Sequence, residues 1–165
     1  MPRAARNLEI LAEYLAHRLE RSGRRRSHRI GNRIVGTGPP ALRPHQIIDA
    51  LALHHDLLTL RRRERAFFDD KERLLDGNCL SSSAFLLRYL MPDAAEDRLL
   101  LVNLGADLEM DSLADPLLAP PPGRRWHLIW SSEAFAYGGG GIRPLDLEGR
   151  WALSSDAAVV LAPVA

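Results

Sequence analysis

The chain has 165 residues, which is enough for one domain, or for one domain with a helical arm. Its 46% hydrophobic and 26% charged residues are ordinary values for a globular protein. The sequence contains no run of 18 apolar residues, which excludes a transmembrane helix, and it begins without an apolar signal-peptide core, so we expect a cytoplasmic protein. The single cysteine, Cys79, excludes an intrachain disulfide and a multi-cysteine metal site, and without a basic neighbour we expect it to be inert.

The net charge of +1 is unevenly distributed along the chain. Residues 1–66 carry 14 arginines against 6 acidic residues, and residues 67–165 carry 8 basic against 15 acidic residues. This asymmetry is compatible with nucleic-acid binding, with attraction between the two halves, or with a missing partner domain.

The first predicted element is a helix over residues 4–21. Its apolar side chains recur at spacings of three and four, and Ser22 and Gly23 end it. The stripe consists of Leu8, Leu11, Leu15 and Leu19, widened by Ile10 and Tyr14. A helix with one apolar face must pack on something, either on the domain that follows or on a partner outside this chain.

Residues 24–43 have the composition of a linker, rich in glycine and proline. Their arginine cluster could contact phosphate backbones, but no aromatic residues for base stacking lie between the arginines. The cluster consists of Arg24, Arg25, Arg26, Arg29 and Arg33. We therefore predict a solvated linker rather than a nucleic-acid site. We also expect residues 1–43, this linker with its helical arm, to be dispensable for folding of the domain behind them.

A second helix is predicted over residues 44–66, with Pro44 in its first turn and arginines near its end. One apolar stripe is marked by Ile47, Leu51 and Leu58, and it is broadened by Leu53, Leu57 and Leu60. The His54-His55-Asp56 sequence suggests a metal or catalytic cluster. Adjacent helical residues point about 100° apart, so we do not expect these three side chains to converge on one ion.

From Phe67 onward the apolar residues alternate with a period of two. Strands are predicted near residues 85–90, 97–104, 108–110, 124–131, 142–147, 151–153 and 157–161, separated by turn residues. This pattern predicts a mainly β domain over residues 67–165. We expect an antiparallel β-sandwich of about six or seven strands, preceded by two helices.

The segment RRWHLIWSSEAFAYGGGG, residues 124–141, is the most distinctive part of the chain. Trp126, Leu128 and Trp130 fall at period two, so we expect them to share one strand face. With Trp151, these tryptophans could stack on sugar rings, but we favour packing in the core. The run Gly138 to Gly141 lacks the lysine and following helix of a phosphate-binding loop, so we expect a turn.

The blocks LLLVNLG, DPLLAPPPGRRWHLIWSSEAFAYGGGG and AAVVLAP appear in the order found in the C-terminal β-domain of malto-oligosyltrehalose trehalohydrolases, which they resemble. Those enzymes are α-amylase-type members of glycoside hydrolase family 13. The upstream ALHHDLLTLRRRERAF looks like their last barrel helix. The resemblance covers roughly residues 44–163. It implies a β-domain, and for the whole enzyme it implies release of trehalose from maltooligosyl trehalose.

No catalytic residue carries over from this resemblance. Catalysis in the family requires carboxylates on a (β/α)8 barrel, and such a barrel takes about 250 residues. Glu133, Asp146 and Glu148 are acids near the tryptophans, but each falls in a polar turn, where a solvated acid is expected. We expect no metal or cofactor.

We therefore expect a non-catalytic accessory domain or fragment. Its partners would be a separate catalytic barrel chain or an α-glucan oligosaccharide, with no membrane contact. A carbohydrate-binding module and a truncated remnant without activity remain the alternatives.

Overall fold

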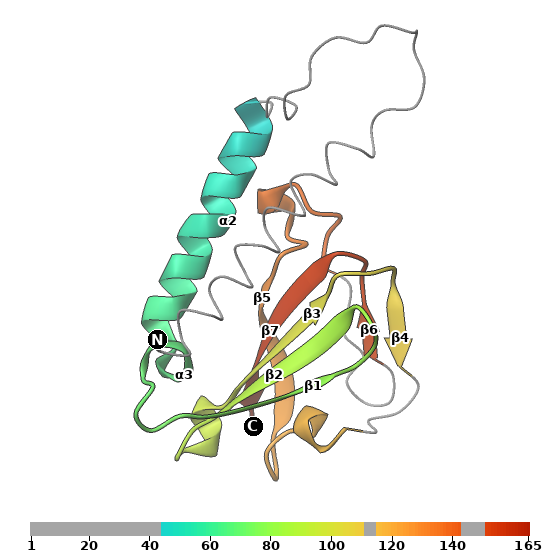
Figure 1. Ribbon diagram of the computed structural model, residues 1–165. Coiled ribbons are helices and arrows are strands. Elements are labelled where there is room, and N and C mark those ends of the chain that lie inside the picture. The colour runs from blue at the N-terminus through green and yellow to red at the C-terminus, as the bar shows by residue number, and fades with distance from the viewer. Residues whose placement is uncertain (1–43, 111–114, 143–150) are drawn as a thin grey trace, which may run out of the picture.

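The computed structural model describes residues 44–110, 115–142 and 151–165. A helix precedes a mainly β domain (Figure 1). The helices are α2 (Pro44–Arg63) and α3 (Arg65–Phe68), with short 3-10 turns η1 (Ala94–Glu96), η2 (Pro116–Leu118) and η3 (Phe135–Tyr137). The strands are β1 (Leu74–Cys79), β2 (Ala84–Leu90), β3 (Arg98–Asn103), β4 (Leu108–Met110), β5 (Arg125–Ser131), β6 (Trp151–Leu153) and β7 (Ala157–Val164).

The strands form two antiparallel sheets. Five of them make a sheet in the order β1-β2-β3-β7-β5, and β4 pairs with β6 in a separate two-stranded sheet. The central strand β7 has the sequence AAVVLAPV and is buried along nearly its whole length. A continuous apolar run of this kind is expected where a strand is covered on both faces.

The first face of the large sheet is covered by the small sheet and by η2. Alternate residues of β2, β3 and β7 point to this side, among them Leu86, Leu101 and Leu161, and all three are fully buried. Trp151 and Leu153 of β6 pack against them. This core therefore lies between two β layers, as expected for a sandwich.

The second face of the large sheet is covered by α2 (Figure 1). Leu53 of the helix is buried against Val102 of β3 and Val160 of β7, and Leu57 and Leu60 pack beside it. Near the end of the helix a smaller cluster centres on Ala66, Tyr89 and Met91. In the part of the chain that the structure describes, no helix is long and apolar enough to cross a membrane.

The prediction of a mainly β, antiparallel domain preceded by a helix is confirmed. The helix predicted over residues 44–66 is divided into α2 and α3, because Glu64 between them adopts an extended conformation. Strand β1 was not predicted, because its sequence LLDGNC has the composition of a turn. The helix predicted over residues 4–21, the linker over 24–43 and most of the strand over 142–147 lie outside the described residues.

Candidate functional site

The two tryptophans of β5 do not share one face, which corrects the expectation from their spacing. Trp126 belongs to the core on the first face of the sheet, and Trp130 belongs to the core beneath α2. The pairing of β5 with β7 shifts between Leu128, opposite Leu161, and Trp130, opposite Val160. This β-bulge inserts one extra residue, and a shift of one residue turns the following side chains to the other face.

Trp126 is held by polar contacts inside the domain. It is 4% exposed, and its indole Nε1 donates a hydrogen bond to the Leu118 carbonyl oxygen at 2.7 Å. The Arg88 guanidinium lies over the indole ring, 5.3 Å from its centroid. A ring enclosed in this way is part of the fold and has no free face for a sugar.

Arg88 forms a buried ion pair with Asp97. Its Nη2 lies 3.0 Å from Asp97 Oδ2, and its Nη1 donates to the carbonyl oxygens of Leu117 and Ala119. Asp97 Oδ1 also accepts a hydrogen bond from the Met91 backbone N–H at 2.9 Å. Buried charges persist where they are paired, and through its two terminal nitrogens Arg88 joins β2 to η2 and to Asp97 at the end of η1, while its Nε is buried without a hydrogen-bond partner among the described residues.

Trp130 lies at the junction between the sheet and α2. It is 8% exposed, and its ring is tilted by 35° against that of Tyr137, with 6.3 Å between the centroids. The Tyr137 hydroxyl donates a hydrogen bond of 2.6 Å to Asp56 Oδ2. Burial, and then this hydrogen bond, raise the pKa of Tyr137 to about 12. The hydrogen bond from Tyr137, followed by that from His55, lowers the pKa of Asp56.

The His54-His55-Asp56 sequence does not act as one group in this geometry. Both histidines are exposed, and His55 Nδ1 lies 3.1 Å from Asp56 Oδ1. The other carboxylate oxygen of Asp56 accepts the hydrogen bond from Tyr137, so Asp56 contributes to the contact between α2 and η3. Within the described residues, no three His, Cys, Asp or Glu side chains are grouped as metal ligands.

Glu133 is half-buried in a turn and supports the glycine run through an exposed hydrogen bond. Its carboxylate accepts a hydrogen bond from the Gly140 backbone N–H at 3.0 Å, and its carbonyl oxygen accepts one from Gly141 at 2.8 Å. A Cβ on Gly139 would lie 2.3 Å from the Glu133 carbonyl, so only glycine fits there. Asp146 and Glu148 lie outside the described residues.

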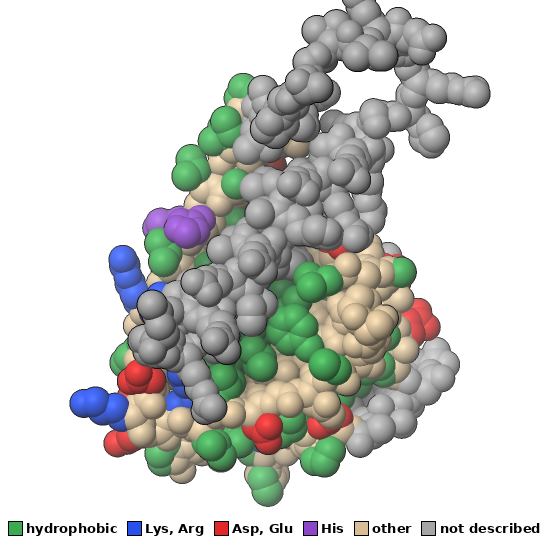
Figure 2. Space-filling view, in the orientation of Figure 1, with side chains coloured by type: hydrophobic (Ala, Val, Ile, Leu, Met, Phe, Trp, Pro, Cys, Tyr) green, Lys and Arg blue, Asp and Glu red, His purple; other side chains and the backbone are tan. Residues whose placement is uncertain are grey.

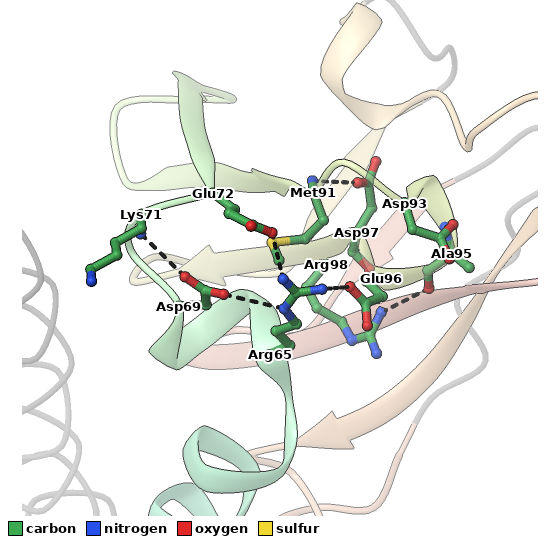
Figure 3. Close-up of polar contacts among 10 residues, drawn as sticks. All are labelled: Arg65, Asp69, Lys71, Glu72, Met91, Asp93, Ala95, Glu96, Asp97 and Arg98. Atoms are coloured by element: carbon green, nitrogen blue, oxygen red, sulfur yellow. Dashed lines mark hydrogen bonds and ion pairs between the residues drawn. The ribbon is translucent and has the colours of Figure 1, made fainter.

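A polar cluster fixes the end of the helical segment to the β domain (Figure 3). Arg65 contacts Glu72 and lies 3.2 Å from Asp69 and 3.1 Å from Glu96. Beside it, Arg98 Nε of β3 donates to Glu64 at 2.7 Å. The helical segment is thus joined to the β domain by ion pairs at its C-terminal end and by the hydrogen bond from Tyr137 to Asp56 near the middle of the segment.

The surface of α2 that faces away from the sheet carries exposed apolar side chains in the first half of the helix, and the exposed His54 and His55 follow them. Ile47, Ile48 and Leu51 are 45%, 65% and 64% exposed, and Figure 2 shows hydrophobic side chains along this part of the helix. The predicted stripe of Ile47, Leu51 and Leu58 therefore lies on the opposite side from Leu53. Contiguous exposed apolar surface of this kind marks an interaction site more often than a single exposed leucine does.

Sequence reasoning did not find the Arg88–Asp97 pair or the Tyr137–Asp56 contact. The only signal for the first was an arginine at an apolar position of β2. The second joins residues 81 positions apart, and local sequence carries no sign of it.

This geometry defines a β domain with a helix fixed to one face of its sheet. The tryptophans of the domain pack in its cores, and Glu133 holds the glycine run. Residues 72–160 match the family described as Domain of unknown function (DUF3459), which is more than half of the chain. The chain belongs to this family, a domain found at the C-terminus of α-amylase family glycoside hydrolases. No curated protein matches the chain.

Proposed function

We propose that this chain is the non-catalytic C-terminal accessory domain of an enzyme similar to malto-oligosyltrehalose trehalohydrolase. Such an enzyme is a glycoside hydrolase that acts on α-1,4-glucan-derived maltooligosyl trehalose in trehalose biosynthesis. The family match over residues 72–160 carries the accessory-domain part of this proposal. The sequence blocks in the trehalohydrolase order support the specific enzyme.

The described residues also support a role without catalysis. A retaining glycosidase needs two carboxyl groups about 5 Å apart on either side of the sugar ring. Glu133 is instead bound to the glycine run, and Asp97 is paired with Arg88 inside the core. Burial of Trp126, Trp130 and Trp151 weighs against a carbohydrate-binding module that stacks on these rings.

The first test is an activity assay on the purified chain. We expect no trehalose release from maltooligosyl trehalose above a blank without protein. Turnover well above that blank would disprove the absence of catalysis.

The proposed partner is a separate catalytic barrel chain. To test this, a trehalohydrolase barrel expressed without its own C-terminal domain is mixed with this chain, and trehalose release is compared with that of the barrel alone. We expect an increase with this barrel and none with a matched α-amylase barrel. An equal increase in the activity of both barrels would support the accessory role and disprove the trehalohydrolase assignment. No increase with either barrel would disprove the proposal that a catalytic barrel is the partner.

A further inference from the structure

Helix α2 has apolar side chains on two opposite sides. At about 100° per residue, Leu51 and Leu53 point about 160° apart. Leu53 is buried against the sheet, with Leu57 and Leu60 beside it. On the other side Ile47 and Leu51 are exposed, and Leu58 continues their stripe. A helix that is apolar on both sides is typical of one that is covered on both.

We propose that residues 4–21 form an amphipathic helix that packs on this outward face of α2. Their stripe of Leu8, Leu11, Leu15 and Leu19 would cover the exposed apolar side chains of this face. Eighteen helical residues would span about 27 Å, and the 20 residues of α2 span about 30 Å. The two apolar stripes therefore match in length.

The connection between the two segments favours contact within one chain. Residues 22–43 can span up to about 70 Å, so the helix predicted over residues 4–21 can reach either end of α2. Covalent linkage through residues 22–43 gives an effective concentration on the order of millimolar, far above that of a second copy in dilute solution. Residues 1–43 as a whole carry 10 arginines against 3 acidic residues, with the excess in the linker, whereas residues 44–165 carry 12 basic against 18 acidic residues, so long-range attraction draws the N-terminal segment toward its own domain. This contact does not depend on the proposed function.

Cysteine cross-linking of the full chain tests the contact. In a Cys79→Ser background, Leu51→Cys is combined with Leu15→Cys, which lies in the apolar stripe of residues 4–21. The matched control combines Leu51→Cys with Glu13→Cys, which lies about 160° from the middle of that stripe on a helix. We expect an intrachain disulfide under mild oxidation from the first pair, forming at least several-fold faster than from the control.

A second measurement does not require cysteines. The double variant Leu11→Ser/Leu15→Ser should bind several-fold more of an apolar fluorescent dye than the unchanged chain, and Glu13→Ser should not. Equal cross-linking of both cysteine pairs would overturn the proposal, because it would show only random collisions of the tether. Disulfide-linked dimers would assign the face to a second copy. No cross-link together with unchanged dye binding would leave the face to a separate partner.

Discussion

The two faces of the five-stranded sheet are closed in different ways, and each holds one tryptophan of β5. The Trp126 face is covered by the small sheet and η2, and the Arg88–Asp97 pair is sealed within it. Among the described residues, the Trp130 face is covered mainly by α2, which is attached through Leu53 and through the hydrogen bond from Tyr137 to Asp56. The first face is completed by the β domain itself. The second face depends on an element that also presents apolar side chains outward.

Removal of either tryptophan should have the largest effect on stability. Trp126→Ala and Trp130→Ala should each lower the free energy of unfolding by about 3–5 kcal/mol, since each leaves a cavity in a core. Trp126→Ala should be the more costly, because it also removes the hydrogen bond to Leu118 and the contact with Arg88. Chemical denaturation measures both values.

His127→Ala is the matched control, since it changes an exposed residue of the same strand and should have little effect. The tryptophan fluorescence of the unchanged chain should be blue-shifted and insensitive to maltooligosaccharides. The assignment of Trp130 to the core would be wrong if Trp130→Ala left the melting temperature unchanged and the fluorescence of the unchanged chain responded to maltooligosaccharides. Sugar binding would then be the better interpretation.

The helix that closes the Trp130 face provides the next prediction. Leu53→Ala should lower the free energy of unfolding by about 2–5 kcal/mol, because Leu53 is 6% exposed in the core beneath α2. Leu51→Ala, two residues away on the outward side, should cost less. Thermal and chemical denaturation of the two variants give the difference directly. Equal losses would show that the two sides of α2 are equally important for folding.

Much of the β domain could be predicted from the sequence, because its strands are marked by local patterns. Strands β2, β3 and β7 were found by alternation or by apolar runs between turn residues. Strand β1 was not, because it is an exposed edge strand containing Asp76 and Gly77. There a side chain would collide with the next strand, since a Cβ on Gly77 would lie 2.7 Å from Leu87 Cδ2.

The opposite faces of Trp126 and Trp130 could not be predicted, because the period-two rule assumes a regular strand. The bulge at Ile129 arises from pairing with β7, about 30 residues later in the chain, and a single strand sequence does not show it. The contacts of the candidate site could not be predicted for the same reason, because they join segments that are far apart in the sequence. The position of Asp56 toward Tyr137 follows from the packing of α2 on the sheet, whereas its neighbours in sequence suggested a cluster with histidines.

The smallest effect is expected from the hydrogen bond that ties η3 to α2. Tyr137→Phe should lower the free energy of unfolding by about 1 kcal/mol at neutral pH, the usual net value of one hydrogen bond. Asp56 is 48% exposed at its side chain, and screening by solvent keeps the electrostatic part small. Asp56→Asn and the double variant complete a double-mutant cycle that isolates the pair.

The pH dependence of this loss gives a sharper test, because the two groups titrate at opposite ends of the scale. The pKa of Asp56 is lowered from 3.8, so its contribution is present above that value and is lost as the pH falls through the lowered pKa. The pKa of Tyr137 is raised from 10.0 to about 12, so its contribution is complete below pH 10.0 and is lost as the pH rises toward 12. The stability difference between Tyr137→Phe and the unchanged chain should therefore be constant near neutral pH and shrink at both extremes. Ultraviolet titration of the phenol should show the pKa of Tyr137 moving down toward 10.0 in Asp56→Asn, and a pKa that does not move would show that burial alone, without Asp56, sets its value.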